Sequence, residues 1–364
     1  MLPLVKTLLP SREVLMPELE KILYSGYIAQ GDVVDDFEMA FKRYIGSGYT
    51  LSLNSGTAAL HIALILAGVK EGDEVISTAL TAEPTNVAIK MIGAKIRYAD
   101  VDLKTGGILP LSIEKNINRK TKAILFVDYA GVPSDVKSIK KISEKYNIPV
   151  IEDAAHALGA TFEGKKIGCH FPFTVFSFQA IKHLTTIDGG ALQIQDKALY
   201  KKAKKIRWFG LDKGIPRLKN DITFQGYKYH MNNVNACVGL VQLRNIESIV
   251  EKYVRNGEYL DTYLKDIQDI ELLEYYPNSK PSYWLYTIKV KRDREALIKK
   301  LAENGIMASE LHKRSDLHTY LNDFPNTKLS NLDIFYTEML HLPCGWWVTE
   351  EDCEKMVRII KEGW

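Results

Sequence analysis

The chain has 364 residues, of which 46% are hydrophobic and 26% charged, a balance typical of a globular protein with a sizeable core. The formal net charge is only +3, and the lysines are scattered along the chain, which argues against a nucleic-acid-binding protein. No apolar run reaches the roughly 18 residues of a membrane span, and Met1–Pro10 is too short for a signal peptide, so we expect a cytoplasmic protein without a membrane partner.

The region from Tyr49 to Ile194 alternates strand patterns with helical patterns. Strands are expected at Tyr49–Leu53, Glu74–Ser77, Ile96–Val101, Ala123–Val127, Pro149–Glu152, Phe173–Phe178 and Ala191–Ile194. Helices are expected at Gly56–Ala67, through Val87–Ile92 and at Asp135–Tyr146, with Ser55 and either Ser134 or Asp135 as candidate caps. This alternation predicts an α/β fold whose sheet is mostly parallel and covered by helices on both faces.

The second half of the chain indicates a smaller α+β domain. After the irregular segment Lys213–Gln225, a long helical pattern runs from Asn233 to about Ile267, with a possible break near Asn256. A strand at Trp284–Val290, a helix at Arg294–Asn304, a strand at Ile306–Leu311 and a final helix at Glu350–Lys361, capped by Thr349, are expected to follow. We therefore expect a large domain at residues 1–245 and a small domain at residues 246–364.

The four cysteines carry no metal or disulfide pattern. Cys169, Cys237, Cys344 and Cys353 form no CxxC pair and no zinc-like spacing with histidine. We expect reduced thiols and no metal site.

In parallel sheets, ligands bind at the carboxyl ends of the strands, so the residues after each strand are the candidate site. The first candidate is the strand-to-helix turn Asn54-Ser55-Gly56-Thr57. The backbone N–H groups and the dipole of such a helix start form an anion site. A plain capped helix start explains the same residues.

The second candidate is Asp153, which directly follows an apolar strand. A buried carboxylate is costly unless it is paired, and a protonated pyridine nitrogen is a suitable partner. A loop cap or an ion pair is the alternative. For the nearby His156, local hydrogen bonds are the alternative to a ligand contact.

The third candidate is Lys182, which follows an aromatic-rich strand and precedes Gly189-Gly190. A lysine in a partly buried, apolar setting has a lowered pKa and can attack an aldehyde. Ser177 can donate a hydroxyl hydrogen bond to a phosphate. A surface lysine in a loop is the alternative.

In the fourth candidate, Lys228 stands among tyrosines, where it could reach a phosphate or belong to a solvated loop.

At these four places the sequence resembles the DegT family of nucleotide-sugar aminotransferases, which are fold-type I pyridoxal-phosphate enzymes. The resemblance covers nearly the whole chain, beginning at Ser25–Gly31. Its most specific pieces are Ile151–Ala157, Ser177–Gly190 and Gly226–Gly239.

The resemblance implies a role for each candidate. Lys182 is expected to hold the cofactor as a Schiff base, Asp153 to face the pyridine nitrogen and His156 to lie near the cofactor ring. The phosphate would be bound by Ser55, Gly56, Thr57 and Ser177. The position of Lys228 implies contact with the phosphate of a neighbouring subunit's cofactor, and hence a homodimer with shared active sites.

The resemblance implies a substrate site around Lys213–Gln225 and Glu310–His318. His183, His312 and Arg314 are candidate substrate ligands, the last two for a diphosphate. A solvated charged loop is the alternative.

The chain departs from many relatives at two cofactor positions. Ala82 stands where relatives carry an aromatic ring that stacks on the cofactor, and Lys228 stands where many have asparagine. The stacking at Ala82 would be missing or would come from another ring.

The resemblance implies transfer of an amino group from an amino acid, expected to be glutamate, to a nucleotide-linked keto-deoxy sugar. A sugar dehydratase on the same scaffold, in which histidine replaces the lysine, is disfavoured by the presence of Lys182. The residues also leave room for a non-catalytic, cofactor-binding regulatory protein and for a purely structural protein.

Overall fold

A seven-stranded sheet forms the centre of the computed structural model, which describes all residues from 1 to 364. Its strands are β1 (Tyr49–Leu53), β2 (Glu74–Thr78), β3 (Lys95–Ala99), β4 (Thr121–Val127), β5 (Val150–Asp153), β8 (Phe173–Ser177) and β9 (Gly190–Ile194). Their order is β1-β9-β8-β5-β4-β2-β3, and β9 alone runs antiparallel to its neighbours. The expected mostly parallel sheet is confirmed.

The antiparallel direction of β9 follows from what connects it to β8. A parallel neighbour needs a crossover that passes over one face of the sheet, usually as a helix. The connection at residues 178–189 contains no helix, and β9 starts at the same end of the sheet at which β8 finishes. It therefore leaves Lys182 at the carboxyl end of β8.

Helices cover both faces of this sheet. The helices are α1 (Arg12–Leu23), α2 (Asp32–Ile45), α3 (Gly56–Leu66), α4 (Glu83–Met91), α5 (Pro110–Asn116), α6 (Val136–Tyr146), α7 (Lys197–Ile206), α8 (Asn233–Leu243), α9 (Ile246–Leu264), α10 (Arg294–Glu303), α11 (Ser330–Glu338) and α12 (Glu350–Lys361). Along β4, Ala123 and Leu125 share an apolar cluster with α3, whereas Ile124 and Phe126 share another with α2 and α6. Successive strand side chains point to opposite faces, so both faces of β4 are buried.

Local capping fixes where several helices begin. The Ser55 hydroxyl accepts from the Ala58 N–H at 3.1 Å, and Asp135 accepts from the Ser138 N–H at 3.0 Å. Thr349 and Asp352 form a reciprocal capping box at the start of α12. These contacts confirm three of the caps expected from the sequence.

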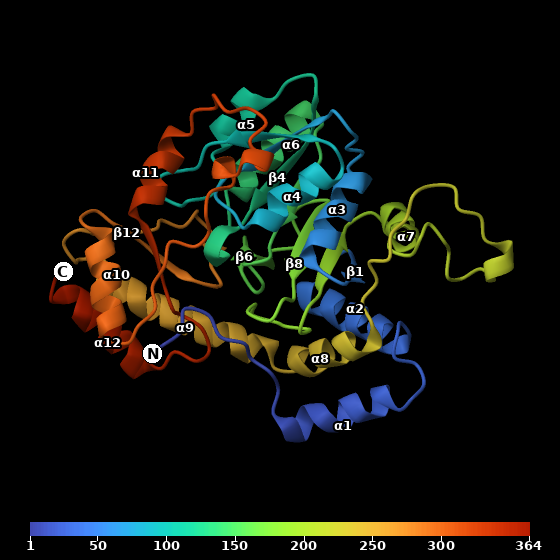
Figure 1. The fold of residues 1–364 in the computed structure, drawn as a ribbon, viewed down its shortest axis with the longest axis horizontal. Coiled ribbons are helices and arrows are strands. Elements are labelled where there is room, and N and C mark those ends of the chain that lie inside the picture. Colours follow the sequence, from blue (N-terminus) through green and yellow to red (C-terminus); the bar gives the residue numbers. More distant parts are fainter.

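A smaller α+β unit follows the sheet. Its strands β10 (Ile270–Leu272), β12 (Tyr286–Val290) and β13 (Met339–Leu342) form an antiparallel sheet that packs with α9, α10 and α12 around a separate apolar cluster. A further small sheet joins β6 (Thr161–Phe162) and β7 (Lys165–Lys166) to β11 (Ser279–Lys280). Figure 1 shows α9 leading from the central sheet to this unit. The boundary at residue 245 stays a prediction, because Ile249 and Val250 of α9 pack with the large core.

Two expectations for this half were wrong. The break in the long helical pattern lies between Leu243 and Ile246, whereas Asn256 lies inside α9. The Asn256 amide donates to three carbonyl oxygens of the 344–348 loop at 3.0–3.2 Å, so it does not compete with its own helix. The expected strand Ile306–Leu311 contributes only two isolated bridges, at Ile306 and Ser309.

A segment that we call the strap, Ser309–Leu329, returns from the small unit to the large one. The Ser315 N–H donates to the Ala79 carbonyl at 2.9 Å, and Lys90 pairs with Asp323 at 2.6 Å. Leu321 and Leu329 join the apolar cluster of α3. The strap therefore packs as part of the large core.

A second segment, which we call the arm, is Leu211–Phe224 between α7 and α8. It projects away from the body of the molecule, in yellow at the right of Figure 1. Its side chains Ile215, Leu218 and Ile222 are exposed. No helix in the structure is long and apolar enough to cross a membrane.

Candidate active site

A cavity of about 340 Å³ lies at the carboxyl ends of the sheet strands. The segments that follow β1, β2, β5 and β8 line it, together with Trp284 before β12 and His312 of the strap. Of the residues singled out from the sequence, it brings together Ser55, Gly56, Thr57, Asp153, His156, Ser177, Lys182 and His312, with Ala82 beside them. The position agrees with the rule for ligand sites in parallel sheets.

The start of α3 forms a narrow anion cradle against β8. A Cβ atom added to Gly56 would lie 3.3 Å from the Ser177 Cβ, and one added to Gly190 would lie 2.5 Å from the Gly56 nitrogen. The approach at Gly190 requires glycine, and the approach at Gly56 leaves a side chain little room. The first N–H groups of a helix have no acceptor within it, so Gly56 and Thr57 present donors to the cavity beside the Ser177 hydroxyl. The cradle fits a phosphate group.

The Asp153 carboxylate is buried and held by two donors. Its Oδ2 accepts from the Thr85 hydroxyl at 2.8 Å, and its Oδ1 accepts from the Ala155 N–H at 3.1 Å. The Thr81 hydroxyl lies 2.8 Å from that of Thr85 and completes a short chain. Burial raises the pKa of Asp153, while the two donors and the charge of Lys182 oppose this rise. A cationic ring nitrogen would complete this site.

The Lys182 side chain meets an aromatic ring in the same cavity. Its Nζ lies 3.7 Å from the centroid of the Trp284 ring. Burial lowers the pKa of Lys182 to about 7, although the Asp153 carboxylate favours the charged form. Near neutral pH a large share of the amine is therefore unprotonated and nucleophilic.

Three nearly parallel rings supply flat apolar faces. His156 stacks on Trp284 with centroids 3.9 Å apart and an interplanar angle of 17°, and the His312 ring lies 6.1 Å from that of His156. Burial lowers the pKa of both histidines. Ala82 lines the cavity but has no ring, so the aromatic faces of the cavity come from these three residues.

Three sequence candidates lie outside this cavity. His183 is buried beside Tyr253, and its Nε2 lies 3.0 Å from the Ser282 carbonyl. The Lys228 side chain is exposed. Arg314 pairs with the carboxylates of Asp316 at 2.7 Å and Asp333 at 2.5 Å, so a contact with substrate would require one of these pairs to break.

Sequence reasoning missed Thr85 and Trp284. Thr85 lies in the first turn of α4, where nothing in the sequence pairs it with a residue 68 positions later. Trp284 was expected to begin a strand, and β12 begins only at Tyr286. The departure at Ala82 was the available signal, because it left open that another ring supplies the stacking.

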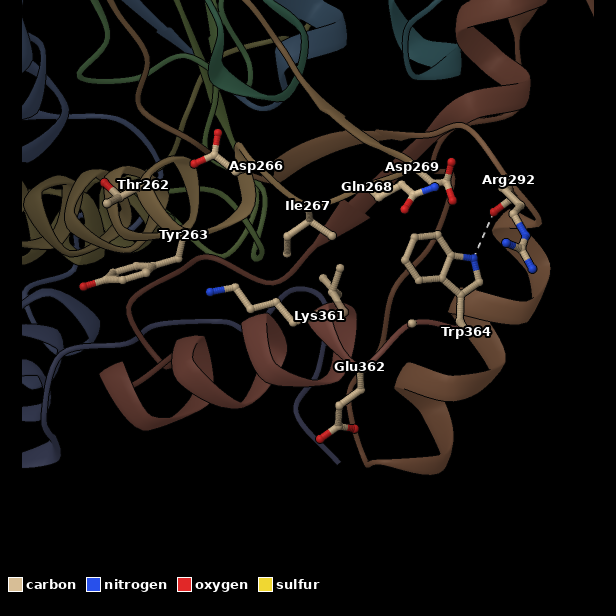
Figure 2. A pocket seen from close by; sticks show the side chains of 12 residues that line it. Thr262, Tyr263, Asp266, Ile267, Gln268, Asp269, Arg292, Lys361, Glu362 and Trp364 are labelled. Carbon is tan, nitrogen blue, oxygen red and sulfur yellow. Dashed lines mark hydrogen bonds between the residues drawn. The ribbon is translucent and has the colours of Figure 1, made fainter.

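A larger hollow, of about 600 Å³, lies on the small unit between the end of α9 and the end of α12. Figure 2 shows Tyr263, Arg292, Lys361 and Trp364 along it, with the Trp364 Nε1 donating to the Arg292 carbonyl at 2.9 Å. The residues that line it include none of the candidates singled out from the sequence. The chemistry therefore favours the smaller cavity. No group of three or more histidine, cysteine, aspartate or glutamate side chains is placed to hold a metal ion.

The sequence matches the model of the DegT/DnrJ/EryC1/StrS aminotransferase family over residues 11–361. This match confirms the resemblance seen in the sequence.

Solved structures agree with this match over the whole chain. AtS13 from Actinomadura melliaura is 36% identical, with a TM-score of 0.96, over 100% of this chain and 99% of that one. The sugar aminotransferase CalS13 from Micromonospora echinospora is 34% identical, with a TM-score of 0.95, over 100% of both chains. Spr1654 from Streptococcus pneumoniae, in its PMP form, is 26% identical, with a TM-score of 0.90, over 100% of this chain and 98% of that one.

Proposed function

The chain belongs to the DegT/DnrJ/EryC1/StrS aminotransferase family and is a pyridoxal-phosphate-dependent sugar aminotransferase, and we propose that it moves an amino group from glutamate to a keto-deoxy sugar linked to a nucleoside diphosphate. The observation that carries this proposal is the meeting of Lys182, Asp153 and the α3 anion cradle in one cavity. Each group has the chemistry that one part of the cofactor requires.

The residues that line the cavity would hold the cofactor at its phosphate and at its ring. In our proposal, Ser55, Gly56, Thr57 and Ser177 hold its phosphate at the start of α3. His156 would lie near its ring, and Asp153 would accept a hydrogen bond from its protonated nitrogen. When bound, the cofactor supplies a reactive carbonyl carbon and a ring that absorbs negative charge.

Lys182 is the proton carrier of the reaction in this proposal. Its Nζ would remove a proton from the α-carbon of the donor and would deliver it to the carbon that receives it on the cofactor. With a pKa near 7, the same nitrogen can act as base and then as acid at neutral pH. Asp153 keeps the ring nitrogen protonated meanwhile. The second half of the reaction uses the same steps in reverse, with the sugar as acceptor.

His312 is our candidate for a sugar contact. Its Nε2 is buried without a hydrogen-bond partner, and the side chain lines the cavity. Because burial lowers the pKa of His312, a neutral ring that hydrogen-bonds a sugar hydroxyl suits it better than a cation on a diphosphate. Arg314, paired with two carboxylates, has no part in this contact.

We further propose a homodimer whose active sites are shared. The arm projects from the body with exposed apolar side chains, and the exposed Lys228 lies outside the cavity of its own chain. Both features favour a dimer in which the second copy covers the arm. Lys228 of one chain would then contact the cofactor phosphate of the other chain.

The test is an absorbance spectrum of the purified protein with pyridoxal phosphate, before and after glutamate. We expect the band of the bound aldehyde form to disappear as the amine form appears, and Lys182→Ala to lose this change. Mass spectrometry of the sugar product then separates an amino sugar from the keto-deoxy product of a dehydratase. An unchanged spectrum with glutamate and with every other amino acid would refute the donor half of the proposal.

A further inference from the structure

Trp284 joins the cavity from the small unit. It lies just before β12 and is 1% exposed, so its indole is enclosed on nearly all sides. Its Nε1 donates to the Ile181 carbonyl at 3.0 Å, which ties it to the residue directly before Lys182. The backbone that carries Lys182 and the indole are thus held together.

The indole contacts two groups of the proposed machinery. The Lys182 Nζ lies 3.7 Å from its centroid, and the His156 ring stacks at 3.9 Å. An ammonium group over an aromatic face is attracted by the negative face of the ring, and tryptophan is the most effective of the aromatic residues. No other tryptophan lines this cavity.

The residue next to Trp284 anchors it to α9. The Tyr283 hydroxyl donates to Asp261 Oδ2 at 2.7 Å, and the hydroxyls of Tyr275 and Tyr286 donate to Asp261 Oδ1 at 3.0 and 2.9 Å. Three hydroxyls on one carboxylate fix the strand entry before β12. These contacts therefore hold the indole in place beside Lys182.

We propose that Trp284 is a positioning residue for Lys182. The aromatic face of Trp284 holds the Lys182 ammonium group that exists between the two proton transfers. The proton leaves the α-carbon of the donor, resides on the Lys182 Nζ, and passes to the cofactor carbon, so no further reactant is needed. This inference rests on the role proposed for Lys182. It also explains how a buried cavity tolerates a transient positive charge.

The inference predicts how Lys182 responds to loss of the aromatic face. Without the indole, the ammonium form loses an attraction that the neutral amine does not feel, so the amine should deprotonate at lower pH. We expect Trp284→Leu to lower the pH midpoint of Lys182 labelling by about one unit in the cofactor-free protein, and Trp284→Phe by less. The probe is trinitrobenzenesulfonate, read as modification of the Lys182 peptide by mass spectrometry.

Turnover gives a second readout. Trp284→Leu should lower kcat by roughly tenfold with little change in the KM for the donor, since the ammonium forms only after the donor is bound. Trp284→Phe should recover part of the loss. Trp346→Leu, which removes an indole that does not line the cavity, is the matched control and should leave both values unchanged.

A shape-preserving series covers the case in which Trp284→Leu fails to fold. Tryptophans with increasing numbers of ring fluorines keep the indole outline but weaken its negative face. The labelling midpoint of Lys182 should fall stepwise along this series.

Borohydride reduction of the cofactor complex first establishes that Lys182 binds the cofactor. If Lys182 is not trapped, the proposed function fails. If it is trapped and the midpoint is the same with every indole, only the role of Trp284 is overturned.

Discussion

Single residues decide the chemistry of this cavity through what surrounds them. Burial raises the pKa of Asp153, and the Thr85 hydroxyl and a backbone N–H that donate to its carboxylate oppose this rise. We predict that Thr85→Val lowers kcat/KM by roughly tenfold, because the carboxylate loses a charge-assisted hydrogen bond. Steady-state kinetics tests this. Thr81→Val, which removes only the hydroxyl behind Thr85, is the control, and an equal loss in both variants would contradict the prediction.

The lowered pKa of Lys182 gives a prediction for pH dependence. Its ordinary value is 10.5, and burial brings it to about 7. Only the neutral amine attacks an aldehyde, so the rate at which the cofactor-free protein captures pyridoxal phosphate should rise about tenfold per unit below pH 7 and level off above it. Stopped-flow absorbance measures this rate. A rise that continues to about pH 10 would show an unperturbed lysine.

Residues that follow strands were predictable from the sequence, and residues that approach from elsewhere were not. Asp153 and Lys182 each come after an apolar strand, and the ends of parallel strands meet at one edge. Trp284 reaches the same cavity from a segment distant in the chain. Thr85 follows β2 but was missed, because its partner Asp153 lies 68 residues later. Ala82 was placed correctly in the turn after β2, but nothing local indicated which ring would compensate for it.

At the scale of elements, the start of α3 against β8 determines the anion cradle. We predict that Gly56→Ala weakens pyridoxal phosphate binding by roughly tenfold, because the new methyl group would press on Ser177 and widen the cradle. Equilibrium titration of the cofactor-free protein measures the change. Gly214→Ala, in the exposed arm, should bind the cofactor as the parent does. Equal affinities for Gly56→Ala and the parent would contradict the predicted crowding of the cradle.

Elements with a clear period and a cap were predictable, whereas those shaped by distant partners were not. The α3 and α12 helices begin at the expected caps because those contacts are local. Asn256 suggested a break, yet its amide bonds to a loop about 90 residues later, which only the folded chain brings near. Ile306–Leu311 has strand-like residues but meets partners at only two points. β9 runs antiparallel because the connection that carries Lys182, residues 178–189, contains no crossover helix.

At the scale of the whole molecule, the proposed sharing of sites between two copies can be tested by mixing variants. Lys182→Ala and Lys228→Ala are each expected to be impaired alone. In a hybrid dimer, the subunit that keeps Lys182 receives an intact Lys228 from its partner, so one site is complete. Random mixing should restore about a quarter of the parent activity. Absence of any recovery, with hybrids shown by native mass spectrometry, would place Lys228 outside the partner's site.

We predict that the strap makes the two units unfold as one cooperative structure. Because Leu321 and Leu329 belong to the core around α3, the chain leaves the small unit, enters the large core and returns through β13. If either unit unfolds, the strap side chains that pack in the large core are expected to lose their contacts as well. Calorimetry should therefore record a single melting transition. His312, which the strap carries to the cavity wall, would then be lost in the same event, so catalytic competence and global melting should disappear together.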